Sequence, residues 1–142
     1  MVTSKYGKYF LTDARTPPDA NVPADYNKWA TRLTYLTGDV IKGAFHFACS
    51  WYYKAPPEPL AAHTHDFDEI LGFYGSDPQN PRDLGGEVEL WIEDEKHILT
   101  ESFLVFIPAG VKHCPLKIKR IDRPMFHLGA SPSHEYIKKD SK

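Results

Sequence analysis

The chain has 142 residues, of which 42% are hydrophobic and 25% are charged, a size and composition typical of one globular domain with its own core. Its formal net charge of −2 excludes the basic field that nucleic acids and anionic membrane surfaces attract. No apolar stretch approaches the roughly 20 residues of a membrane helix, and the first residues lack the apolar segment of a signal peptide. We therefore expect a cytoplasmic protein in which Cys49 and Cys114 form no disulfide.

Short apolar and aromatic runs, separated by prolines and glycines, predict an all-β domain with little helix. Residues 1–30 are expected to form an irregular arm that packs on a barrel of residues 31–130, followed by a polar tail of residues 131–142. Together these parts make one domain of seven or eight strands. In chain order, the strands are expected at Thr31–Leu36, Ala44–Tyr53, Ala62–Tyr74, Glu87–Glu93, Phe103–Ile107, Leu116–Ile121 and Met125–Leu128.

Several local patterns add detail to this list. The segment Gly75–Gly86 is dense in turn-forming residues and is expected to be a loop, with its final glycine pair in a turn. In Glu87–Glu93 the apolar residues alternate with glutamates, so one face is predicted to be buried and the other solvated. The continuous apolar run Phe103–Ile107 predicts a strand that is covered on both faces. The last two strands flank the turn Asp122–Pro124 and are expected to form a hairpin, and the tail after Pro132 to be a short helix or frayed.

Two short motifs carry the residues best suited to chemistry. The first is His63-Thr-His65-Asp-Phe-Asp-Glu69, and the second is Pro108-Ala-Gly110-Val-Lys-His113. Side chains alternate between the two faces of a strand, so an uninterrupted strand would project His63, His65 and Glu69 from one face. Two imidazoles and a carboxylate there, with a third imidazole brought in by folding, make a plausible ligand set for a divalent transition metal.

From about Thr31 to Gly129 the chain resembles the cupin family. The spacing His63-x-His65-x3-Glu69 is similar to the first cupin motif, and Pro108-x-Gly110-x2-His113 is similar to the second. The resemblance implies a double-stranded β-helix, or jelly roll, with one divalent metal per chain at the open end of the barrel. Iron(II) or manganese(II) fits this ligand set best, while nickel, cobalt, copper and zinc remain chemically acceptable.

The resemblance also implies a function, with alternatives. We expect a metalloenzyme that acts on a small oxygen-rich organic molecule, as a dioxygenase-like oxidoreductase first and as an isomerase or decarboxylase second. Glu69 either binds the metal or acts as a catalytic base. The alternatives are a non-enzymatic barrel that binds or senses a small molecule, and a structural or storage role. Neither nucleic acid nor membrane is an expected partner, and a homodimer is expected in each case.

Other residues are weaker candidates. Phe73 is expected to line the substrate pocket because it shares strand parity with Glu69. His46 and His127 also lie in expected strands and are candidates for the pocket, although a hydrogen-bonded or outward-facing imidazole is the simpler interpretation of each. Along the same strand, Phe67 and Leu71 are expected to point inward, and Asp66 and Asp68 to face away from the metal.

Overall fold

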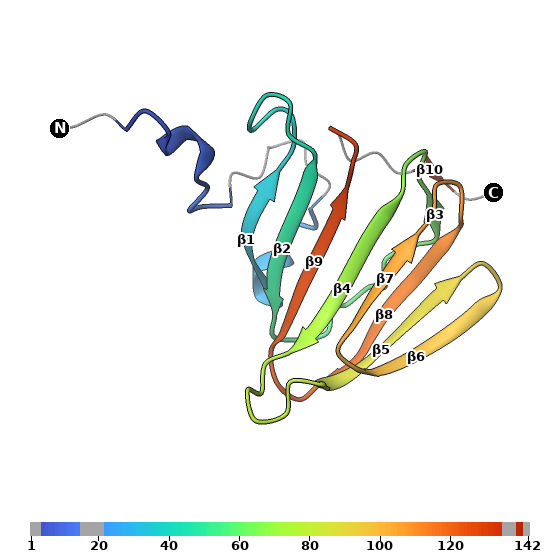
Figure 1. Cartoon of the computed structure of the whole chain (residues 1–142). Coiled ribbons are helices and arrows are strands. Elements are labelled where there is room, and N and C mark those ends of the chain that lie inside the picture. Colours follow the sequence, from blue (N-terminus) through green and yellow to red (C-terminus); the bar gives the residue numbers. More distant parts are fainter. Residues whose placement is uncertain (1–3, 15–21, 135–138, 141–142) are drawn as a thin grey trace.

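The computed structural model describes residues 4–14, 22–134 and 139–140, and the regular secondary structure within them consists almost entirely of β-strands (Figure 1). Two single-turn 3-10 helices, Gly7–Tyr9 and Tyr26–Lys28, precede the first strand. No helix in these ranges has the length and apolar character needed to cross a bilayer. The strands are β1 (Ala30–Leu36), β2 (His46–Tyr52), β3 (His63–Thr64), β4 (Glu69–Gly75), β5 (Asp83–Ile92), β6 (Glu95–Glu101), β7 (Phe103–Ile107), β8 (His113–Ile121), β9 (Met125–Ser131) and β10 (Lys139–Asp140).

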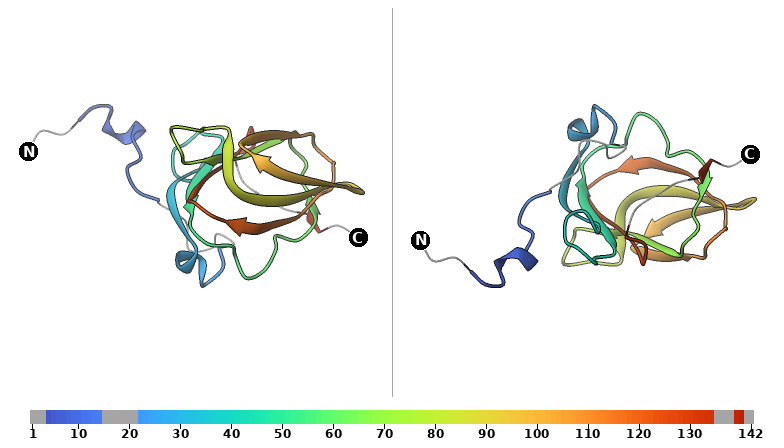
Figure 2. Two further views of the ribbon diagram at one scale, coloured as in Figure 1. Left: turned by 90° about the horizontal axis from the view of Figure 1, so that it is seen from below. Right: turned by 90° about the horizontal axis from the view of Figure 1, so that it is seen from above.

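The strands form two five-stranded antiparallel sheets that face each other. One sheet has the order β1-β2-β9-β4-β7, and the other has the order β10-β3-β8-β5-β6. The views along the molecule in Figure 2 show the two sheets enclosing a common interior, as in a jelly roll. The expectation of an all-β jelly roll is therefore confirmed.

The expected single strand Ala62–Tyr74 is wrong, because the chain leaves one sheet and enters the other within it. β3 pairs with β8 in the second sheet, whereas β4 pairs with β7 and β9 in the first. The four residues between β3 and β4 form the bend that makes this crossing. An alternating sequence pattern continues through the bend, so the pattern alone did not reveal the break.

The expected hairpin of the last two long strands is also wrong. β8 pairs with β3 and β5, whereas β9 pairs with β2 and β4 in the opposite sheet. The turn between them is anchored on β5: the backbone N–H groups of Asp122 and Arg123 donate to the Gly85 carbonyl oxygen at 2.7 and 3.2 Å. The Arg123 guanidinium also donates to Asp83 at 2.6 Å. These contacts direct the chain across the barrel.

The pair Gly85–Gly86 lies inside β5 and not in the expected turn. Gly85 has a φ of +75°, a region that favours glycine. A Cβ on Gly86 would overlap the Arg120 carbonyl oxygen and the Met125 side chain. The backbone conformation therefore explains Gly85, and the close approach of the β8 backbone and the Met125 side chain explains Gly86, where β5 is irregularly paired.

Two further strands were not expected. β6 pairs with β5 across the Glu93–Asp94 turn, and its charged residues hide the strand pattern. In the tail, Lys139–Asp140 forms β10 against β3, so neither a helix nor a frayed end describes these two residues.

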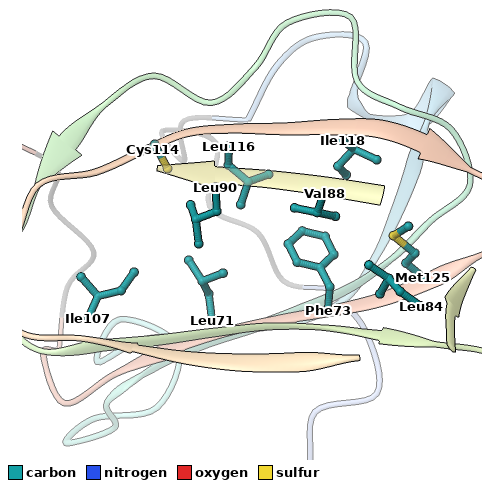
Figure 3. Packing of buried hydrophobic residues seen from close by; sticks show 10 residues of the cluster. All are labelled: Leu71, Phe73, Leu84, Val88, Leu90, Ile107, Cys114, Leu116, Ile118 and Met125. Carbon is teal, nitrogen blue, oxygen red and sulfur yellow. The ribbon is translucent and has the colours of Figure 1, made fainter. Parts of the chain in front are cut away.

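The largest apolar core fills the space between β4, β5, β7, β8 and β9 (Figure 3). The expected burial of Val88 and Leu90 is confirmed, with exposed fractions of 0% and 1%. The run Phe103–Ile107 does form a strand, but the expectation that both its faces are covered is wrong. Leu104 and Phe106 point outward and are 54% and 60% exposed. The buried members of the core are Leu71, Phe73, Leu84, Val88, Leu90, Ile107, Cys114, Leu116, Ile118 and Met125.

At one border of this core, the His127 imidazole stacks on the Phe73 ring with a centroid distance of 4.3 Å. The Tyr52 ring lies edge-on to it at 5.4 Å, and the imidazole Nδ1–H donates to the Gly72 carbonyl oxygen at 2.9 Å. Burial among these groups lowers the pKa of His127 to about 4.

This low pKa predicts a loss of stability in acid. As the pH falls from 6.5 towards 4, the unfolded chain binds a proton at His127 that the folded protein does not, so folding becomes less favourable. The wild-type protein is expected to lose about 3 kcal/mol by pH 4 through this one group. In His127→Gln this part of the pH dependence disappears. Urea unfolding at pH 7 and pH 4, with chelator present, measures the difference.

His97→Gln is the matched control, since His97 lies on the surface with its side chain 43% exposed. An unchanged difference between pH 7 and pH 4 in His127→Gln would contradict the prediction.

Candidate metal centre

Four side chains from both sheets meet at one end of the barrel. His63 on β3 is the cross-strand partner of His113 at the start of β8. His65 follows β3 directly, and Glu69 is the first residue of β4 in the other sheet. The crossing between the sheets therefore brings the carboxylate opposite the imidazoles. The expectation that all three residues of the first motif lie on one strand is wrong, although the motif still delivers them to one place.

Backbone hydrogen bonds join the two motif loops. The N–H of Gly110 donates to the His65 carbonyl oxygen, and the N–H of Ala109 donates to a carboxylate oxygen of Asp68, both at 2.9 Å. Gly110 has a φ of +82°, which suits glycine in this tight turn. These bonds hold the His113 loop against the His65 loop, so the spacing of the imidazoles depends on backbone contacts.

The three imidazoles are buried and close together. Their exposed fractions are 3% for His63, 2% for His65 and 1% for His113. Each offers a ring nitrogen, and the three nitrogens lie within 4.8 Å of one another. Glu69 is 5% exposed, and one of its carboxylate oxygens lies 2.7 Å from Nε2 of His65. All four side chains therefore face one small region.

Hydrogen bonds set the tautomers of two of these rings. Nδ1 of His63 lies 2.7 Å from the Ala61 carbonyl oxygen, and Nδ1 of His113 lies 3.0 Å from that of Val111. A carbonyl oxygen can only accept, so each Nδ1 carries the proton and each Nε2 keeps its lone pair. Metal-binding histidines are commonly oriented in this way.

The donor set fits a divalent transition metal. Three neutral imidazoles, two of them with Nε2 available as a ligand, could hold such an ion. The carboxylate of Glu69 would add one negative charge and a hard oxygen donor. Nothing in this arrangement selects one metal over another.

We call His63, His65, Glu69 and His113 the quartet. Its neighbours in the sequence lie mostly as the sequence indicated. Asp66 and Asp68 are exposed, and Asp66 forms an ion pair with Lys139 at 2.6 Å. Leu71 points inward and is buried. The Phe67 ring is only half-buried and stacks on the His65 imidazole at 4.7 Å, so it helps to fix that ring from the side. Both cysteines are buried thiols.

The three pocket candidates occupy different places. His46 on β2 is buried, with its ring 5.8 Å from that of Tyr35. Burial is the main cause that lowers its pKa to about 4, and the Glu69 carboxylate opposes the shift. His127 lies deeper, and Phe73 is a 1% exposed member of the apolar core.

Two further inward-facing residues, Arg32 and Ser131, were not indicated by the sequence. Their inward direction follows only from the strand register.

Solved structures with the same architecture identify the fold. A cupin 2 domain-containing protein from Halorhodospira halophila is 14% identical, with a TM-score of 0.54 over 87% of this chain and 76% of that chain. A cupin superfamily protein from Desulfitobacterium hafniense is 12% identical, with a TM-score of 0.50 over 82% of this chain and 94% of that one.

An oxalate oxidase in complex with glycolate is 13% identical, with a TM-score of 0.53 over 90% of this chain; the match spans 61% of the oxalate oxidase chain. No family model matches the sequence, and no curated protein matches it either. The shared architecture nevertheless shows that the chain has the cupin fold.

Proposed function

We propose that the protein is a metal-dependent enzyme that acts on a small oxygen-rich organic molecule. The observation that carries this proposal is the buried cluster of His63, His65 and His113, with two of the three Nδ1 atoms held by backbone carbonyls. The similarity to an oxalate oxidase bound to glycolate supports a small hydroxy acid or related compound as substrate.

His63, His65, His113 and Glu69 would hold iron(II) or manganese(II). Such an ion supplies Lewis acidity towards oxygen atoms of a substrate and, when redox-active, access to dioxygen chemistry. Dioxygenase-like oxidation is our first proposal, and isomerisation or decarboxylation the second. Glu69 lies beside His65 at the border of the two sheets, where its carboxylate is placed either to bind the metal or to accept a proton from the substrate.

Removal of two ligands should abolish metal binding. Wild-type protein purified without added metal is expected to contain a stoichiometric divalent ion, and His63→Ala combined with His113→Ala is expected to contain none. Elemental analysis of both proteins measures this. The matched control is His97→Ala combined with His134→Ala, which removes two imidazoles outside the site: His134 is exposed, and the His97 side chain is 43% exposed. Equal metal content in the ligand variant and the wild type would contradict the proposed site.

Turnover is the test of the enzymatic proposal. Iron(II)-loaded protein, mixed in air with hydroxy acids, keto acids and catechols, is expected to consume oxygen and to convert at least one compound. Glu69→Gln should lower the rate by roughly a hundredfold, because it removes either a ligand or a base. Metal content of the same variant distinguishes these two roles. Conversion without oxygen uptake would favour isomerisation or decarboxylation, and no conversion by the loaded protein would contradict an enzyme.

We also propose that the protein is a homodimer that pairs through the outer face of the first sheet. In this sheet, β2, β9 and β4 are inner strands and β7 is an edge strand. Within the described part of the chain, the outward positions of these four strands carry no charged side chain. Two copies of such a face can pack together without burying an unpaired charge. Strand register and burial place these residues there: Phe47, Trp51, Phe126, Leu128, Ala130, Ile70, Tyr74, Leu104 and Phe106.

A charge placed on this face should separate the two copies. Phe106→Glu is expected to be a monomer by light scattering at micromolar concentration, whereas the wild type is expected to be a dimer. Ile98→Glu is the matched control, since Ile98 is 58% exposed on β6 of the other sheet. A monomeric wild type would contradict the proposal.

A further inference from the structure

Strand β1 places an arginine on the inner face of the barrel. Arg32 is the cross-strand partner of Ser50, which is only 2% exposed. The register then shifts at Leu33, so that Tyr35 pairs with Ala48. Ala48 and Ser50 lie on one face of β2, and the bulge therefore turns both Arg32 and Tyr35 inward, although they are three residues apart.

The guanidinium of Arg32 is held by aromatic rings and not by an acid. It lies 5.3 Å from the ring centroid of Tyr26 and 5.1 Å from that of Tyr35. Its Nε is buried, and among the residues that the structure describes it has no hydrogen-bond partner. No carboxylate of these residues forms an ion pair with it. Most arginines on the interior face of a protein are paired with an acid.

The inward positions on the strands next to β1 include two small residues. On β2, the inward position between Ser50 and His46 is Ala48. Its cross-strand partner on β9 is Gly129. A Cβ on Gly129 would meet no atom nearer than the Ile70 carbonyl oxygen at 3.9 Å. The inner face of these strands therefore carries little side-chain bulk at Ala48 and Gly129, and a Cβ at Gly129 would fit without a clash.

Polar groups lie beside these two positions, on the side towards the metal centre. Ser131 follows Ala130, the cross-strand partner of Ile70, and this register puts Ser131 beside Glu69. The Ser131 hydroxyl is buried and has no hydrogen-bond partner among the described residues. The charges of Arg32 and of Glu69 both act on the imidazoles of His46 and His127. Both charges therefore lie near this pair of imidazoles.

We propose that Arg32 binds the carboxylate of a small organic acid, whose remaining oxygen atoms extend past Ala48 and Gly129 towards the metal centre. This inference rests on the proposed function, since it names the substrate class of the same site. A guanidinium can donate two parallel hydrogen bonds to a planar carboxylate. The hydroxyl of Ser131 would donate to a second oxygen of the ligand nearer to Glu69. Arg32 is a specificity-determining residue in this scheme.

The test measures binding and not turnover. Short aliphatic acids from glycolate to glutarate, each beside its uncharged amide, are titrated into metal-free protein and followed by NMR. Wild-type protein is expected to bind at least one acid about tenfold more tightly than its amide, as loss of a charge-assisted hydrogen bond predicts. Arg32→Gln is expected to lose this preference, and Arg32→Lys to keep part of it. Gly129→Val is expected to weaken binding of acid and amide alike, because its side chain would stand on the inner face opposite Ala48, along the proposed path of the ligand.

Arg120→Gln is the matched control, since Arg120 is an exposed arginine paired with Asp122, and it should bind as the wild type does. Thermal melts of each variant show that it is folded. Equal affinities of wild type and Arg32→Gln, or of acids and their amides, would overturn the inference even if the protein binds metal and turns over a substrate. Arg32-dependent binding by protein that holds no metal would support the inference while the proposed function fails.

Discussion

The arrangement of the whole site depends on the contact between two loops. The N–H of Gly110 donates to the His65 carbonyl oxygen, and the N–H of Ala109 donates to the Asp68 carboxylate. These two bonds fix the loop before β8 against the segment that passes from β3 in one sheet to β4 in the other. Because both donors are backbone groups, the geometry survives changes in most side chains of these loops. Nδ1 of His63 and of His113 are anchored in the same way, on backbone carbonyls. Beside this contact, the three imidazole nitrogens lie within 4.8 Å of one another.

Inside the barrel, apolar and polar side chains occupy different sides. β4, β5, β7 and β8 contribute the apolar core that holds the sheets together, whereas β1 and β2 turn Arg32, His46 and Ser50 inward. The border between the two sides runs along β9, where His127 stacks on Phe73. Burial at this border keeps the imidazole neutral. A smaller apolar cluster of Tyr26, Trp29 and Ala30 packs with Tyr52 on the β1–β2 side, so both sides contribute to stability and the polar groups lie between the two clusters.

The sequence was sufficient for the fold class and for the four residues of the quartet, because motif spacing and strand-like patterns are local. It was not sufficient for the connections between the sheets. The bend after His65 and the turn at Asp122 each move the chain into the other sheet, and both are fixed by contacts with residues far away in sequence, Ala109 and Gly85. Arg32 was missed for a similar reason, since a one-residue bulge at Leu33 decides which side chains face inward. Charged β6 concealed its strand character.

β1 is the outermost strand of its sheet, and it contributes nothing to the quartet. Arg32, which we propose recognises an acid, and the side chains that would hold an ion are therefore carried by separate strands, and β2 and β9 lie between β1 and β4 in the first sheet. Such a division lets one part change during evolution while the other is kept. Related barrels could acquire new ligands by exchanging a single edge strand, and the chemistry at the opposite end of the interior would be inherited unaltered.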